Sequence, residues 1–196
     1  MLNELLGLAG FALVVSITPG PNNTLLLASG IQFGFTRTLR HVAGTAMGMA
    51  VLIFVMAAGA GVVLLAVPGA DLALKAIGSA YLLYLAFGIA SSHGASRTAV
   101  SRPLGVLNGA AFQFANPKAW LFALSAASTF LPRGLAPAAA ALAVAATCAV
   151  VILPTASVWA AGGAALSRIV ADGRTQRAIS IALALILAAS VAFIWI

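Results

Sequence analysis

Long apolar stretches alternate with short polar connections along the whole chain. An α-helix needs about 20 apolar residues to cross the hydrocarbon core of a membrane. Six stretches approach or exceed that length, and they cover residues 5–30, 42–67, 72–90, 104–131, a part of 134–167, and 178–196. The pattern therefore predicts an all-α integral membrane protein with six transmembrane helices in one transmembrane domain, residues 1–196.

The first apolar stretch is interrupted near its middle by the sequence TPGPNN at positions 18–23. Proline removes a backbone donor and clashes with the preceding helical turn, and glycine weakens a helix interior. The stretch would be roughly 39 Å long as a helix, which exceeds the ~30 Å hydrocarbon core. We expect a broken helix here, and in lipid such a break is tolerated only where it faces protein or a wet cavity.

A second break is expected at Asn116-Pro117-Lys118, within the fourth apolar stretch. Stretches one and four are each the first of three, so equivalent helices of the two halves would run in opposite directions. Inverted repeats with discontinuous helices near mid-membrane are typical of secondary transporters. We therefore predict a 3+3 inverted repeat, with half one at about 1–90, a cytoplasmic connection at about 91–103 and half two at about 104–196.

Both breaks carry the signature of a helix start. Thr18-Pro19 and Asn116-Pro117 each read as an N-cap residue followed by proline at the first helical position. Free N–H groups and the positive end of each helix dipole would then favour a negative group such as a carboxylate. Carbonyls left by the preceding half-helices would suit an ammonium group or a cation. The structural alternative is a pair of kinks that only shape packing.

Ten residues at or near the breaks are the candidate substrate-binding residues. Lys118 is the only charge well inside an apolar stretch, and such a side chain is usually functional, unless the break places it at the membrane interface. Asn22 and Asn23 are either ligands or partners of freed backbone groups. Gln113 and Asn116 share a helix face, for a ligand or for cross-helix hydrogen bonds. The full set is Thr18, Pro19, Gly20, Pro21, Asn22, Asn23, Gln113, Asn116, Pro117 and Lys118.

Charge is scarce in this chain and unevenly placed. Only 7% of the residues are charged, against about 25% in soluble domains. The net charge of +7 reflects missing acids, and the bases form no patch for nucleic acid. The connections after stretches one, three and five hold Arg37, Arg40, Arg97, Arg102, Arg168, Arg174 and Arg177, and the opposite side holds Lys75 and Arg133. Basic loops stay cytoplasmic, which predicts a multi-pass protein of the bacterial inner membrane with both termini outside.

The remaining polar side chains suggest no cofactor or metal. The single cysteine, Cys148, excludes a disulfide framework. His41 and His93 lie among arginines, and we expect them to be solvated at the interface and not to ligate a metal. The N-terminus has no basic n-region, so no cleavable signal peptide is expected. Packing roles are expected for Thr45, Thr147 and Ser157.

The motifs resemble a known family. Positions 19–22, followed by glycines at 30, 34, 44 and 48, resemble the N-terminal signature of the lysine-exporter (LysE/RhtB) family of amino-acid efflux permeases. Positions 116–118, followed by Trp-Leu-Phe, resemble the second signature of this family, so the resemblance covers essentially the whole chain. It implies export of amino acids or close derivatives, driven by a proton or ion gradient. It also implies a central site that contains Pro19, Gly20, Pro21, Asn22, Asn116, Pro117 and Lys118.

One departure from the family concerns the substrate. An exporter of basic amino acids would be expected to offer a buried acid. No Asp or Glu lies between Glu4 and Asp71, or between Asp71 and Asp172. A neutral or small polar amino acid is therefore favoured, with Lys118 as the only obvious buried titratable group. Oligomeric state is left open, with a homodimer as one option.

Two alternative functions are an enzyme and a structural subunit of the membrane. A membrane-embedded enzyme lacks support, because the apolar stretches contain no acid, no histidine pair and no Ser-His arrangement. A membrane scaffold or assembly subunit predicts a dry, fully packed centre. Two glycine pairs with small-xxx-small spacing, Gly30/Gly34 and Gly44/Gly48, predict close approach between helices, although such spacing is common in glycine-rich chains.

Overall fold

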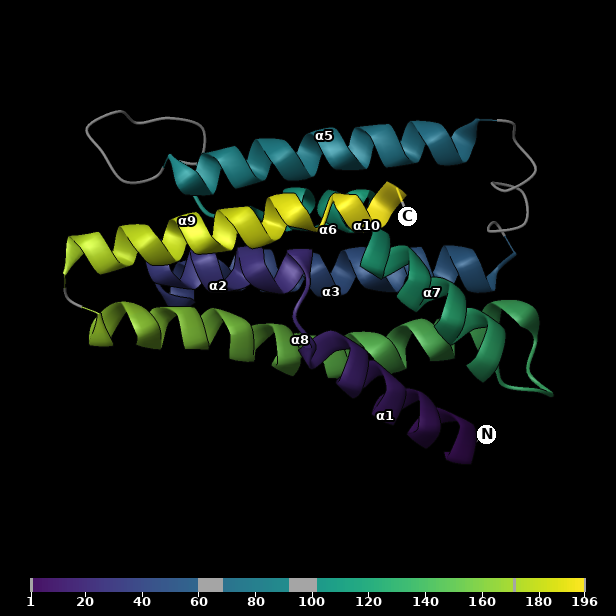
Figure 1. Cartoon of the computed structure of the whole chain (residues 1–196). Helices are drawn as coiled ribbons and strands as arrows, with labels where there is room; N and C mark the ends of the chain where they lie inside the picture. The colour runs from purple at the N-terminus through teal and green to yellow at the C-terminus, as the bar shows by residue number, and fades with distance from the viewer. Residues whose placement is uncertain (1, 60–68, 92–101, 171, 196) are drawn as a thin grey trace.

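The computed structural model describes residues 2–59, 69–91, 102–170 and 172–195. In these residues all the regular elements are helices (Figure 1). They are α1 (Leu2–Ile17), α2 (Pro21–Phe33), α3 (Phe35–Ala57), α5 (Ala70–Ala90), α6 (Val106–Ala115), α7 (Pro117–Phe130), α8 (Pro137–Ile169), α9 (Gly173–Ala189) and α10 (Ala192–Trp195). The prediction of an all-α protein is confirmed for this part of the chain.

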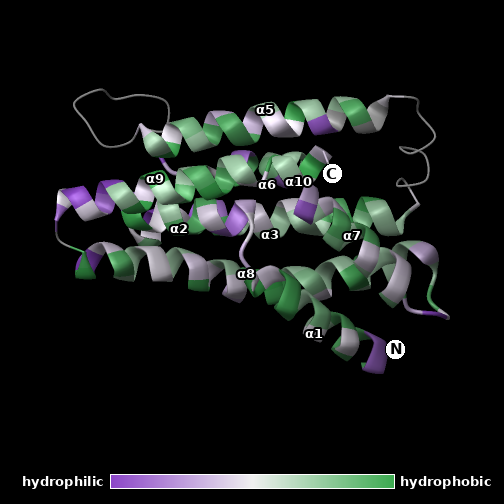
Figure 2. Cartoon of the chain, viewed as in Figure 1, coloured by the Kyte–Doolittle hydropathy of each residue, from purple (hydrophilic) through white to green (hydrophobic). Residues whose placement is uncertain are grey.

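Two helices, α3 and α8, are long and apolar enough to cross a membrane by length and composition. The pair α1 and α2 bends by 59° at its break and would be a third span if it is counted as one. Large apolar side chains also lie on the outer surface of several helices, among them Leu107, Leu121 and Val150. Figure 2 shows the hydrophilic residues concentrated at the N-terminal ends of α1 and α9 and apolar residues along most of the helices. An apolar exterior of this kind fits a lipid environment.

The first break lies two residues later than the sequence indicated. Gly20 is the N-cap of α2, and Pro21 is its first residue. The prediction that Thr18 caps a helix beginning at Pro19 is therefore wrong. A residue before proline is disfavoured in the α conformation, so Gly20 cannot sit inside a helix that continues into Pro21. Its φ of 179° and ψ of 176° are fully extended.

The second break lies at the predicted position. Asn116 separates α6 from α7, and Pro117 is the first residue of α7. The Asn116 side chain accepts a hydrogen bond from the backbone N–H of Lys118, at 3.2 Å. The N-cap prediction for Asn116 is therefore confirmed.

The polar connection expected around residues 32–41 is mostly helical. Only Gly34 separates α2 from α3, and its φ of 79° lies in the left-handed region that favours glycine. Arg37, Arg40 and His41 therefore belong to α3. His41 is 1% exposed, so the expectation that it is solvated is wrong. The expectations for His93 and Arg97 fall outside the described residues.

Glycines allow two pairs of helices to pack main chain against main chain. In α3, a Cβ added at Gly44 or Gly48 would collide with the backbone of α6. A Cβ added at Gly30 of α2 would collide with the Ala160 carbonyl of α8. The predicted close approach is thus confirmed for these three glycines. Gly34 differs, because nothing lies within 4 Å of its Cβ position and its role is the turn.

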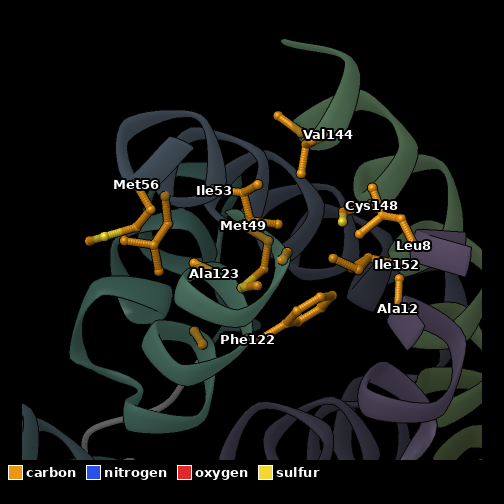
Figure 3. Close-up of a cluster of buried hydrophobic side chains, with 14 of the residues drawn as sticks. Leu8, Ala12, Met49, Ile53, Met56, Phe122, Ala123, Val144, Cys148 and Ile152 are labelled. Atoms are coloured by element: carbon orange, nitrogen blue, oxygen red, sulfur yellow. The ribbon is translucent and has the colours of Figure 1, made fainter. Parts of the chain in front are cut away.

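A cluster of buried apolar side chains fills the space between α1, α3, α7 and α8 (Figure 3). Leu8, Met49, Phe122 and Ile152 each come from a different one of these four helices, and Phe122 packs edge to face on Phe11 at 5.4 Å between ring centroids. Because α1 and α7 are the half-helices on either side of the two breaks, this cluster fixes the position of the breaks relative to α3 and α8.

Candidate substrate site

The structure brings the two helix breaks into direct contact. The ammonium Nζ of Lys118, in the first turn of α7, donates to the Thr18 carbonyl and the Thr18 hydroxyl, both at 2.8 Å. It also donates to the Pro19 carbonyl at 3.2 Å. These residues are about 100 positions apart in sequence. Lys118 therefore places a positive charge at the C-terminal end of α1, where free carbonyls and the helix dipole favour a cation.

Asn23 supplies further donors to the end of α1. Its Nδ2 donates to the Ser16 carbonyl at 2.7 Å and to the Thr18 carbonyl at 2.8 Å. The Thr24 hydroxyl donates to the Gly20 carbonyl at 3.0 Å. Side-chain donors thus reach the Ser16 and Thr18 carbonyls at the first break, as a break in a lipid environment would require.

Gly20 leaves room for the stem of Lys118. A Cβ at Gly20 would lie 2.8 Å from Cδ and 3.2 Å from Nζ of Lys118. Because the Gly20 backbone is extended, any residue tolerates its dihedral angles, and the reason for glycine here is space. A side chain at position 20 would collide with Lys118, so glycine there allows the lysine to reach across the break.

Asn22 joins three helices through one buried amide. Its Oδ1 accepts from the Thr45 hydroxyl of α3 at 3.0 Å and from Gln113 Nε2 of α6 at 2.9 Å. Gln113 Nε2 also donates to the Gly109 carbonyl at 3.2 Å. All of these side chains are buried, and buried polar groups are expected to have partners. The network fixes the first turn of α2 against the second half of the chain.

A cavity of about 50 Å³ lies between these groups. A water molecule needs about 10–15 Å³ of such volume, so the cavity has room for about three or four waters. The centre of the protein is therefore not fully packed, which removes the feature that the scaffold hypothesis required. The polar side chains in its wall come from Ser16, Asn22, Asn23, Thr45, Gln113, Asn116, Lys118 and Thr155.

The ten candidate residues divide by position. Pro21 and Pro117 are the first residues of α2 and α7 and do not line the cavity. Thr18 and Pro19 are exposed, and they contribute carbonyls to the contact with Lys118. The other six line the cavity, and they are Gly20, Asn22, Asn23, Gln113, Asn116 and Lys118.

Sequence reasoning missed several residues of the cavity wall. Thr45, expected to be a packing residue, donates to Asn22 and lines the cavity. Thr45 directly follows Gly44, whose helix face packs closely on α6, and this position could have indicated that Thr45 contacts other helices. Thr155 follows Pro154 in α8 and also lines the cavity. Thr147, by contrast, donates within its own helix, to the Ala143 carbonyl at 2.8 Å, as a packing residue would.

Among the described residues, no group of three or more His, Cys, Asp or Glu side chains is close enough to hold a metal ion. The chemistry that the cavity offers is therefore that of amides, hydroxyls, backbone groups and one ammonium. Such a set can hold a small zwitterion, because it presents both donors and acceptors.

The family model described as LysE type translocator matches residues 13–194 of the chain. The chain belongs to the LysE type translocator family. The resemblance of the two break motifs to this family is thereby confirmed, and the apolar helices agree with a membrane transporter. A translocator family also agrees with the absence of an enzymatic constellation in the sequence.

Several relatives of this LysE type translocator share the same name. Proteins named cysteine/O-acetylserine efflux protein from Salmonella choleraesuis (strain SC-B67) and Klebsiella pneumoniae (strain ATCC 700721) are 35% and 36% identical over 121 residues. One from Escherichia coli O1:K1 is 34% identical over 122 residues. Each match covers 62% of this chain and 62% of the relative's length. No solved structure matches the chain.

Proposed function

We propose that this protein is a secondary transporter that exports small neutral or polar amino acids, or their close derivatives, from the cytoplasm. The observation that carries the proposal is the contact between the two helix breaks through Lys118, beside a polar cavity. Discontinuous helices that meet around a small polar site are the common binding architecture of secondary transporters. Membership of a translocator family supports the same function.

A zwitterionic amino acid matches the groups around the cavity. The first turn of α2 has no side-chain cap, so its N–H groups and dipole end favour a carboxylate, together with the Lys118 ammonium. The Thr18 and Pro19 carbonyls favour an ammonium group, and Lys118 itself occupies them in this structure. An entering carboxylate would draw Lys118 away and free these carbonyls for the amino group of the substrate.

The absence of acids supports a neutral substrate. Glu4, Asp71 and Asp172 are the only acids in the sequence, and none of the residues that line the cavity is an acid. A cationic side chain would be buried without a counter-charge, which is costly. Relatives named for cysteine and O-acetylserine support a short polar substrate, because both compounds are neutral zwitterions with short side chains.

The cavity must widen during transport. Cysteine has seven non-hydrogen atoms, whereas the cavity has room for about three or four waters. The cavity in this structure is therefore too small for the proposed substrate, and the proposed cycle opens it alternately to the two sides of the membrane.

The proposed architecture is six spans in a 3+3 inverted repeat, with both termini outside the cell. The packing supports it, because α3 of half one contacts both α6 and α7, and α8 of half two contacts both α1 and α2. In Figure 1 both chain ends lie towards the right, whereas the α2–α3 and α8–α9 junctions lie at the left. Arg37, Arg40, Arg168 and Arg174 lie close to those junctions in sequence. Coupling to the proton gradient completes the proposal.

The proposal is tested by retention of amino acids in cells. A strain that lacks its own cysteine exporters is given the wild-type protein, the Lys118→Ala variant or an empty vector, and membrane levels of the two proteins are matched. We expect intracellular cysteine and O-acetylserine to fall only with the wild-type protein. Equal retention with wild type and empty vector would contradict export, and selective loss of lysine or arginine would contradict the substrate class.

A further inference from the structure

The imidazole of His41 is buried without a hydrogen-bond partner. The side chain is 1% exposed, and neither Nδ1 nor Nε2 has a partner in the structure. Neutral imidazole has one donor and one acceptor, and native proteins rarely leave both unmet in a buried position. The central cavity does not include His41. This side chain therefore needs an explanation that the substrate site does not supply.

A small pocket lies beside the His41 ring. The pocket has a volume of about 30 Å³, with room for about two waters, and Ser29, Gln32, Pro103 and Leu104 are among the residues that line it with His41. On its other side the ring packs on α6, because a Cβ at Gly109 would lie 3.1 Å from His41 Cδ2. Water in this pocket is the available partner for the ring nitrogens.

His41 lies between the substrate cavity and the arginine-rich end of the molecule. Thr45, one helical turn further along α3, bonds to Asn22 in the substrate cavity. On the opposite side, Phe33, Leu85, Pro103 and Leu104 line both the small pocket and a wider cavity of about 950 Å³. Arg37, Arg40 and Arg102 line that wider cavity. The imidazole therefore lies beside a pocket that adjoins the basic end, one helical turn from a residue of the central cavity.

The charged and titratable groups near the pocket carry no negative charge. From α3 and from the segment before α6 they are arginines, and α5 contributes Tyr81 and Tyr84 to the wider cavity. From α2 the pocket is lined by Ser29 and Gln32, which do not titrate. An imidazolium has a donor on each nitrogen, and neither ring nitrogen of His41 has a partner in this structure. Protonation of His41 therefore requires the pocket to be hydrated.

We propose that His41 is a proton-binding site that links protonation to opening of the arginine-rich end. On opening, the ring takes one proton from water, and on closing it returns that proton. A group that binds a proton better in one state shifts the population towards that state, so acid favours the open pocket. This inference rests on the proposed export function and names a residue through which the pH at the arginine-rich end would control export.

Pocket opening is measured by thiol labelling. The chain has one cysteine and two histidines, so Leu104→Cys in a Cys148→Ala background gives a single reporter at the pocket wall. Labelling by a water-soluble maleimide is compared with and without His41→Gln, and the ratio removes the intrinsic pH dependence of the thiol. As pH falls below about 6.5, the ordinary pKa of imidazole, we expect the ratio to rise about fivefold. A ratio that does not change with pH overturns the inference.

The effect of a pH gradient on transport is measured in proteoliposomes loaded with cysteine under a reducing buffer. An imposed pH gradient should accelerate cysteine efflux by the wild-type protein and by His93→Gln, the matched control, about fivefold or more. With His41→Gln the gradient should have no effect. Full gradient dependence of His41→Gln overturns the inference, whereas a wild-type protein that moves neither cysteine nor O-acetylserine contradicts the proposed function instead.

A spectroscopic readout covers the case in which His41→Gln does not fold. In the His93→Gln protein, His41 is the only histidine, so its imidazole NMR signals are unambiguous. We expect these signals to shift with pH between about 5 and 8. An imidazole that stays neutral across this range overturns the inference.

Discussion

Each of the two helix breaks leaves backbone groups without helical partners, and different side chains satisfy these groups at the two breaks. At the second break one residue, Asn116, separates two helices, and its own side chain caps the new helix. At the first break three residues separate α1 from α2, the axes bend by 59°, and the N-cap Gly20 offers no side chain. The donors that satisfy the first break come from elsewhere, from Asn23 and from Lys118 in the other half.

The second break is therefore self-sufficient, and the first depends on the second half of the chain. A self-capped break keeps its shape when its neighbours move. A break capped by a distant ammonium changes when that ammonium leaves. In the proposed transport mechanism, the first break would therefore be the part that responds to a substrate, and the second the part that supplies the positive charge.

The largest effect is expected for Lys118→Ala. It removes three donors from the exposed end of α1, so cysteine export should fall to the level of the empty vector. Because Lys118 is half-buried, the loss of unfolding free energy should be about 1–2 kcal/mol, within the range for hydrogen bonds of charged groups. Efflux assays and thermal unfolding in detergent measure the two effects. Lys118→Arg is the control that keeps the charge, and export by Lys118→Ala at the wild-type rate would remove the lysine from the mechanism.

Asn22→Ala should have the next largest effect. It deprives the Thr45 hydroxyl and Gln113 Nε2 of their shared acceptor, although Gln113 retains the Gly109 carbonyl. Leaving buried donors unmet costs about 1–3 kcal/mol, and we expect export to fall about tenfold to a hundredfold. Thr147→Ala, which loses a bond only within its own helix, is the matched control. Similar export by both variants would show that the Asn22 network is not part of the site.

The comparison of the breaks is sharpest in a pair of asparagine variants. Asn23→Ala removes two bonds to carbonyls at the end of α1, whereas Asn116→Ala removes one helix cap, which is worth about 1 kcal/mol. We expect Asn23→Ala to lower the unfolding free energy by about 2 kcal/mol, roughly twice the loss for Asn116→Ala. Denaturant unfolding of the two purified variants tests the order, and the reverse order would mean that the first break does not depend on added donors.

The smallest effect is expected at a cap far from both breaks. Asp172 is the N-cap of α9 and accepts a hydrogen bond from the Thr175 backbone N–H at 2.7 Å. This bond lowers the pKa of the exposed carboxyl below its ordinary value of 3.8. A lowered pKa in the folded state contributes stability above the unfolded pKa, and this contribution is lost only as pH falls through the folded pKa. Asp172→Asn should therefore lower the unfolding free energy by the same small amount at every pH between 5 and 8 and leave export unchanged; a change that varies with pH in that range would contradict this account.

The sequence predicted a structural feature correctly where neighbouring residues alone determine that feature. The Asn116 cap was located correctly because an asparagine before proline defines a helix start by itself. At the first break two prolines offered two possible starts. The restriction that Pro21 places on Gly20 decides between them in favour of the later start.

The failures at His41 and Thr45 have a different origin. Arginines around His41 indicated a solvated loop, but these arginines lie on a helix whose other face packs on α6. The buried side of a helix near its end depends on which other helices pack against it. These helices lie far away in the sequence, so the residues around His41 do not reveal them. Thr45 was assigned to packing for the same reason, because its partner Asn22 lies 23 positions away.

The glycine contacts have a consequence for how the molecule moves. Gly44 and Gly48 press α3 onto α6, and Gly30 together with Gly163 presses α2 onto α8, main chain against main chain. At these main-chain contacts, here called seams, no side chains lie between the helices. One helix therefore cannot slide past the other by repacking of side chains. Each seam fastens a helix from the first half of the sequence to one from the second. In the proposed transport cycle each rigid body would therefore contain helices from both halves of the sequence, and a rocking motion would not separate the first half of the sequence from the second.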